Sequence, residues 1–148
     1  VKVRDPEAQA QRWSAAIADL ARPGDVRALR LPLLHVVMSL RLCALFERAE
    51  REPLAELSTR FASFTAARAV LDLARTIRAV WPEAYVCARP CCMKMTPDEA
   101  TLAALGRAAL SGDRAAFTRQ IDGFIRFDRH DRLHSAMLTA LTCLPRQG

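Results

Sequence analysis

Residues 96–117 read TPDEATLAALGRAALSGDRAAF and contain two helix starts with one helix end between them. Thr96 is a favoured cap, the proline after it suits the first helical position, and Glu99 can reach back to the amide of the cap. Leucine and alanine follow, until Gly112 ends this helix and Asp113 caps the next one. So short a break predicts an antiparallel helical hairpin and therefore a helical fold.

The composition of the whole chain favours the same class. Ala and Leu are abundant, while glycines number only five and aromatic residues make up 6%. Ala and Leu lose little on entering a helix, and the residues that favour strands are under-supplied. A chain of 148 residues suits one domain with one core. We expect a soluble, single-domain (residues 1–148), all-α bundle of five or six helices with a cysteine-containing loop.

Apolar residues recur at helical spacing outside the opening stretch. The expected helices begin near Asp5, Pro32, Pro53, Thr96, Asp113 and Asp131. The first carries Trp13 and Ile17 on one face. The third is expected to reach Val80, which is long for a globular helix, and Ser58 and Thr59 could cap a second start within it. Residues 84–87 have some strand character but no partner strand, so we expect a connector there.

Three of the five cysteines, Cys87, Cys91 and Cys92, fall in one short loop before the Thr96 helix. Nearby basic residues and the positive end of that helix are expected to favour thiolates, which bind metals and act as nucleophiles. The spacing differs from a zinc knuckle, which has a second cysteine pair elsewhere. Zinc or iron binding, redox activity, and simple packing of small apolar thiols all stay open, and we expect no cofactor.

His130 and His134 stand four residues apart and could share one helix face, as a metal-binding pair does. Cys143 or Asp131 could add a ligand. The simpler interpretation is a pair of surface histidines in the charged segment 126–132. A mixed site would require this pair to meet the cysteine loop, so the candidate metal ligands are Cys87 and its two loop neighbours together with both histidines.

The net charge is +6, and only Lys2 and Lys94 among the 22 basic residues are lysines. Arginine suits phosphate recognition, but these arginines are scattered, few aromatics accompany them, and a GC-rich coding sequence also explains the excess. We therefore do not expect a nucleic-acid partner. No apolar stretch is long enough for a membrane helix, and residues 1–5 lack signal-peptide features. A cytoplasmic protein with reduced thiols is expected.

Known catalytic motifs are missing from the sequence. It contains no G-x-S-x-G elbow, no phosphate-binding glycine loop, no dinucleotide fingerprint and no H-E-x-x-H. The acidic pair at 98–99 is better explained by helix capping than by acid–base chemistry. We expect no catalytic residues.

Residues 88–100, ARPCCMKMTPDEA, resemble a family of small uncharacterised alphaproteobacterial (sphingomonad-type) proteins. That family's pattern is a long helix, a turn rich in Pro-Cys-Cys, and then Met-Thr-Pro-x-Glu-Ala. The similarity covers residues 61–143. Members commonly carry a third consecutive cysteine where this chain has Met93, which weakens a metal site built on three adjacent thiols. The resemblance implies bacterial origin and no assigned activity.

The expected helices offer more apolar surface than a small domain easily buries, because the second has a wide apolar arc and the third is long. We therefore expect a homodimer or a protein–protein interaction module. The alternatives are a thiolate site in the cysteine loop and nucleic-acid binding through the scattered arginines.

Overall fold

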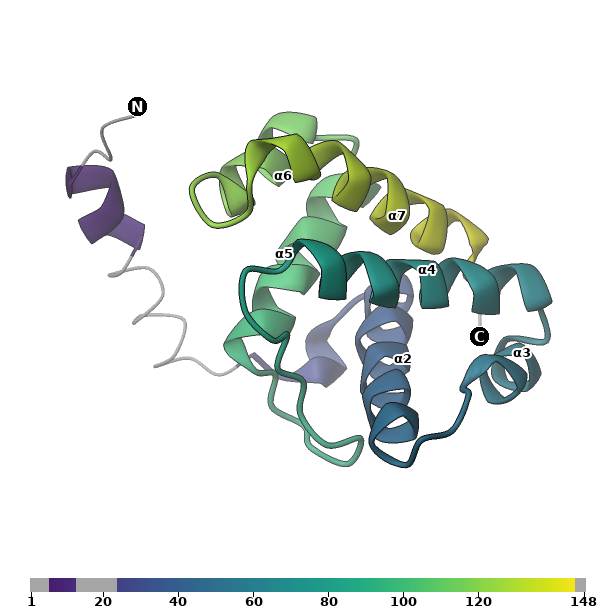
Figure 1. Ribbon diagram of the computed structural model, residues 1–148. Coiled ribbons are helices and arrows are strands. Elements are labelled where there is room, and N and C mark those ends of the chain that lie inside the picture. The colour runs from purple at the N-terminus through teal and green to yellow at the C-terminus, as the bar shows by residue number, and fades with distance from the viewer. Residues whose placement is uncertain (1–5, 13–23, 146–148) are drawn as a thin grey trace.

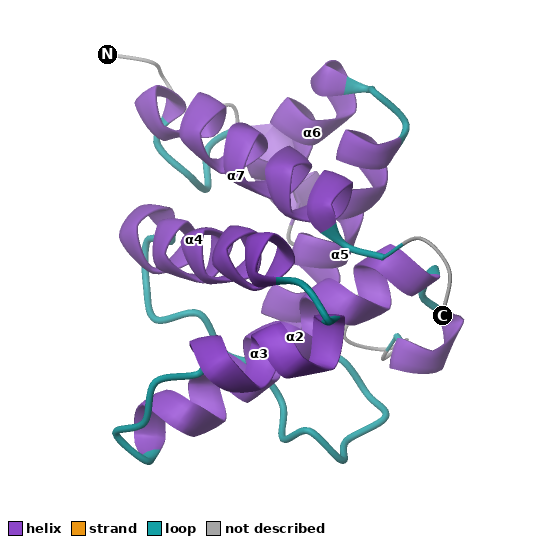
Figure 2. Cartoon of the chain, turned by 90° about the vertical axis from the view of Figure 1, so that its right-hand side faces the viewer, coloured by secondary structure: helices purple, strands orange, loops and turns teal. Residues whose placement is uncertain are grey.

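The computed structural model describes residues 6–12 and 24–145, and every regular element in them is helical (Figure 1). The helices are α2 (Leu31–Arg48), α3 (Leu54–Phe61), α4 (Phe64–Val80), α5 (Pro97–Leu110), α6 (Arg114–Ile121) and α7 (His130–Cys143), with 3-10 turns η1 (Val26–Ala28) and η2 (Phe127–Arg129). Figure 2 shows no strand in this part of the chain, where a single isolated bridge joins Asp25 to Lys94. The predicted all-α class is confirmed.

The described residues contain seven α-helices, namely the six from α2 to α7 and the helical residues 6–12, where five or six were expected. The additional helix arises because the long third helix is broken. Ala62 takes a left-handed conformation (φ 50, ψ 35) that ends α3, and the Ser63 side chain caps α4 by accepting from the Ala66 amide. Ser58 and Thr59, the predicted restart, lie inside α3. A second start was predicted, but its position was missed because glycine usually marks this conformation, and here alanine adopts it.

The predicted start and end signals of α5 and α6 are confirmed. The Thr96 hydroxyl accepts from the Glu99 amide at 3.1 Å, and the Glu99 carboxylate accepts from the Thr96 amide at 3.0 Å. Gly112 has φ 69, and Asp113 caps α6 through the Ala116 amide. These caps satisfy backbone amides that an open helix end would leave unpaired.

The first expected helix is described only in part. Residues 6–12 are helical, whereas Trp13 and Ile17 lie outside the described residues. None of the helices that the structure describes has both the length and the hydropathy to cross a bilayer.

Helices α4 and α7 lie side by side, and α2 and α5 run across them (Figure 1). Their facing sides form one core with residues from α3 and α6. Helices α2 and α5 pack closely at Gly106. A Cβ there would lie 2.3 Å from Cδ2 of Leu33, so any larger residue would force that leucine to move. The core thereby fixes the position of α2 relative to α5.

Replacing Ala62 with glycine is expected to raise the free energy of unfolding by about 0.5–1 kcal/mol. Glycine avoids the steric cost of a left-handed alanine, and this gain exceeds the added entropy of the unfolded chain. Ala55→Gly is the matched control at an exposed position inside α3, and it is expected to cost up to about 1 kcal/mol. Urea denaturation followed by circular dichroism measures both, and a loss of stability in both variants would contradict the left-handed break.

Candidate binding site at the cysteine loop

The cysteine loop, residues 82–95, connects α4 to α5 and passes along α2. Cys91 is exposed, while Cys87 and Cys92 are half-buried. The loop has no regular secondary structure apart from its isolated bridge, so its backbone groups need other partners. Those partners decide its shape.

The central partner is Arg41 of α2, whose side chain is fully buried. Its guanidinium grips the Glu99 carboxylate with two bonds, Nε to Oε2 at 2.7 Å and Nη2 to Oε1 at 3.1 Å. It also donates to three loop carbonyls: Cys92 at 2.7 Å, Lys94 at 3.2 Å and Arg89 at 3.3 Å. The five N–H groups of a guanidinium thus meet five oxygen acceptors. This pairing raises the pKa of Arg41, chiefly through the hydrogen bonds that its guanidinium donates to Glu99.

Sequence reasoning missed Arg41, although a signal was present. It is the only charged residue between Pro32 and Glu47, within the apolar arc of a central helix. Arginine is almost never fully buried without a partner. An arginine in the buried arc of a central helix therefore predicts a buried acidic partner. Glu99 was recognised only as part of a capping box.

The first half of the loop is held by the start of α5. The Asp98 carboxylate accepts from the Trp81 indole at 3.2 Å and from the Val86 amide at 2.8 Å. The Thr96 hydroxyl donates to the Val86 carbonyl at 2.6 Å. Asp98 was expected to serve only the first turn of its helix; it also fixes the point where the chain leaves α4.

The second half of the loop is held by the segment before α2. The Val26 amide donates to the Met93 carbonyl at 2.8 Å, and the Met95 amide donates to the Gly24 carbonyl at 2.8 Å. Together with Arg41, these bonds fix the loop backbone at several points along its length.

The pKa of the Cys87 thiol is not lowered, as the basic neighbours suggested it would be. Burial raises the pKa of Cys43, on α2, to about 11. Burial, followed by the charge of Glu99, raises the pKa of Cys87. The Cys92 thiol donates to the Lys94 carbonyl at 3.4 Å. The expectation of activated thiolates is wrong for Cys87, because the cations that should lower its pKa act more weakly than burial and Glu99.

The histidine pair of α7 lies in separate surroundings. His130 is buried, with Nε2 2.8 Å from the Ile125 carbonyl. The His134 ring meets the Phe117 ring edge to face at 4.8 Å between centroids. The two histidines therefore face different partners, a carbonyl of the turn before η2 and a ring of α6. The interpretation of two surface histidines is wrong for His130.

The structure does not gather the predicted metal ligands. Cys87, Cys91 and Cys92 belong to the loop at the bottom of Figure 1, whereas His130 and His134 belong to α7 at its top. Within residues 6–12 and 24–145, no three His, Cys, Asp or Glu side chains form a group that could hold a metal ion. Zinc or iron binding stays an open alternative, to be checked by elemental analysis of the purified protein.

A shallow groove of about 550 Å³ separates the end of α2 from the tip of the cysteine loop. We call it the loop groove; it is lined by Leu45, Arg48, Ala49, Arg89, Pro90 and Cys91. Leu45 is 44% exposed, so it adds apolar surface to the groove. Its two arginines make no ion pair with any described residue, so the groove combines apolar surface with two available cations.

Arg41→Met is expected to lower the free energy of unfolding by about 3–5 kcal/mol, because it leaves the Glu99 carboxylate buried and uncompensated. Glu99→Gln keeps an acceptor oxygen and should cost less. Arg60→Met is the control, since it breaks the exposed Arg60–Glu56 pair and should cost at most about 1 kcal/mol. Urea denaturation measures the free energy of unfolding of each variant. Equal decreases in the Arg41 and Arg60 variants would contradict the central role of the buried pair.

Thiol modification at pH 8 is expected to reach Cys91 first and Cys43 last. Cys91 is exposed, whereas a pKa of about 11 leaves Cys43 with very little thiolate at that pH. Timed iodoacetamide labelling with mass spectrometry measures the order, and Cys91→Ser should remove the fastest phase. Labelling of Cys43 should accelerate as the pH rises toward 11. Equal rates at both positions in the folded protein would refute this assignment.

Comparisons with protein-family models, with curated proteins and with solved structures find no match to this chain. The resemblance of residues 88–100 to a bacterial family therefore stays an expectation. The function has to be inferred from the loop groove and from the contacts that hold it.

Proposed function

We propose that this protein is an interaction module that binds an acidic, partly apolar segment of another protein in the loop groove. Arg48 and Arg89 would pair with carboxylates of the partner, and Leu45 would pack against an aliphatic side chain. The observation that carries the proposal is the lining of the groove, where two guanidinium groups that form no ion pair with any described residue flank exposed apolar surface. Arginine and exposed apolar surface together are typical of protein interfaces.

The rigidity of the cysteine loop supports this function. Arg41 holds the carbonyls of Arg89 and Cys92, which bracket the loop residues that line the groove. A surface that is already fixed loses little entropy when a partner binds, so more of the contact energy appears as affinity. The buried ion pair thus supports binding without touching the partner.

The charge of the protein supports an acidic partner. The chain carries a net charge of +6, and no carboxylate lines the groove. Opposite net charges speed association and help exclude wrong partners. A second copy of the chain would bring the same positive charge, which disfavours a homodimer through this groove. The homodimer is the competing outcome of the test below.

The double variant Arg48→Ala/Arg89→Ala is expected to bind acidic peptides about tenfold more weakly than the unmodified protein, because it removes two charge-assisted contacts. The matched control is Arg68→Ala/Arg132→Ala, which removes the same charge at exposed positions outside the groove. The probes are fluorescent hexapeptides of Asp, Glu and Leu, measured by anisotropy at low and high salt. Binding should weaken as salt rises.

Two outcomes would overturn the proposal. Equal losses in the two double variants would show that only net charge matters and that the groove has no special role. Light scattering that shows a dimer, disrupted by the groove variant but not by the control, would identify a second copy as the occupant instead.

A further inference from the structure

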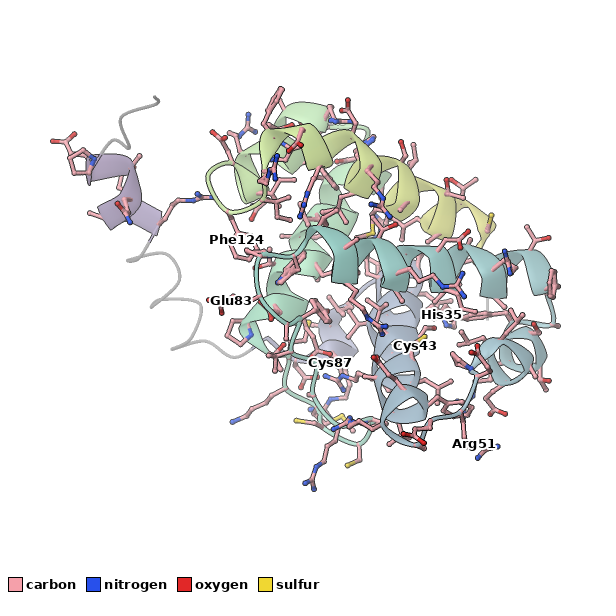
Figure 3. The ribbon with its side chains drawn as sticks, viewed as in Figure 1. His35, Cys43, Arg51, Glu83, Cys87 and Phe124 are labelled. Atoms are coloured by element: carbon pink, nitrogen blue, oxygen red, sulfur yellow. The ribbon has the colours of Figure 1, made fainter. Side chains whose placement is uncertain are left out.

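The turn between α6 and α7, residues 122–129, carries two exposed aromatic side chains, and we call it the aromatic turn. Phe127 is 80% exposed, the largest exposed fraction of any large apolar side chain in the described residues, and Phe124 is 39% exposed. Figure 3 shows Phe124 at the upper left of the molecule and Arg51, just beyond the groove end of α2, at the lower right. The aromatic turn is therefore an apolar surface separate from the loop groove.

We propose that the aromatic turn is a contact surface for a second copy of this chain, which gives a weak two-fold dimer with both loop grooves open. A two-fold axis brings the same surface of both copies together. With the axis at Phe127, the two phenylalanine rings pack on each other and leave water. A partner with two acidic segments would then bind through both grooves, a consequence that rests on the proposed function.

The charges beside Phe127 make the turn complementary to itself. Arg126 precedes Phe127 and Asp128 follows it, and the two form an exposed ion pair at 3.1 Å within the chain. A two-fold axis at Phe127 reverses the chain direction, so Arg126 of each copy faces Asp128 of the other. An exposed ion pair contributes little stability, so exchanging it for a pair between copies costs little.

The local charge favours a second copy over an anionic partner. Residues 122–129 contain two aspartates and two arginines, so their net charge is zero, although the whole chain carries +6. Nucleic acids and anionic membranes are bound by positively charged surfaces, which this turn does not offer. Two copies can meet at the aromatic turn without the repulsion that two loop grooves would impose.

The aromatic turn is held in place by contacts on its inner side. His130 Nε2 donates to the Ile125 carbonyl at 2.8 Å, since a carbonyl can only accept, and the Arg129 guanidinium donates to the Ala79 carbonyl of α4 at 3.0 Å. The Phe124 ring meets the Trp81 ring edge to face at 5.3 Å between centroids. A surface that is already fixed loses little entropy when two copies associate.

Analytical ultracentrifugation of the unmodified protein should show a monomer–dimer equilibrium with a Kd of about 10–100 µM, because a contact of this small area is weak. Phe127→Asp should weaken dimerisation by about tenfold or more, since it places a charge at the apolar centre of the contact. Phe64→Asp is the matched control, because Phe64 is 62% exposed and begins α4 at the end away from Ala79. It should leave the Kd unchanged.

Exchanging the charges tests the two-fold arrangement. Arg126→Asp should weaken dimerisation about tenfold, because four carboxylates would then meet near the axis. Arg126→Asp/Asp128→Arg restores opposite charges across the axis and should return the Kd to within about threefold of the unmodified value. The altered side chains are all exposed, and circular dichroism with melting temperature establishes that each variant folds.

The proposal is overturned if the unmodified protein is a monomer at every concentration up to its solubility limit. A dimer that Phe127→Asp leaves intact, or that the charge exchange fails to restore, overturns it equally. Arg48→Ala/Arg89→Ala separates the two proposals, because it should weaken peptide binding and leave the dimer unchanged. Loss of the dimer in that variant would place the contact in the loop groove instead and would also overturn the proposal.

Discussion

The buried pair of Arg41 and Glu99 is the contact on which the described structure depends. Removing two charges from water costs free energy of desolvation, and this cost is offset only where every donor and acceptor has a hydrogen-bond partner. Here the guanidinium meets the carboxylate and three loop carbonyls, and the carboxylate also accepts from the amide that begins α5. One side chain thereby joins a central helix, an irregular loop and the start of another helix.

The cysteine loop then separates two surfaces of different chemistry. Its tip forms one side of the loop groove, where Arg48 and Arg89 offer positive charge to solvent. Its first residues line a second hollow of about 340 Å³, which α2 and α4 also line. Because one fixed backbone lines both hollows, occupation of either would further restrict the same segment. In the proposed function, the loop acts as a support for these surfaces.

Local patterns predicted the helices well, because a cap and its helix lie within a few residues of each other. The Thr96–Glu99 capping box is such a pattern. The Arg41–Glu99 contact spans 58 residues, and no local rule connects its ends. The position of the break at Ala62 escaped prediction because alanine takes a conformation that usually needs glycine. Sequence reasoning also misjudged Cys87, since neighbours in sequence suggested activation whereas burial governs its pKa.

The way in which Arg41 holds the loop has a consequence for specificity. It binds carbonyl oxygens, which every residue has, so the loop can keep its path whatever side chains it carries. The side chains of Arg89, Pro90, Cys91 and Met93 all point toward solvent and are exposed. Substitutions there would alter the chemistry of the groove while leaving the buried contacts unchanged. A backbone fixed from within, with outward side chains free to differ, suits a recognition surface better than a catalytic centre, where side-chain identity is itself constrained.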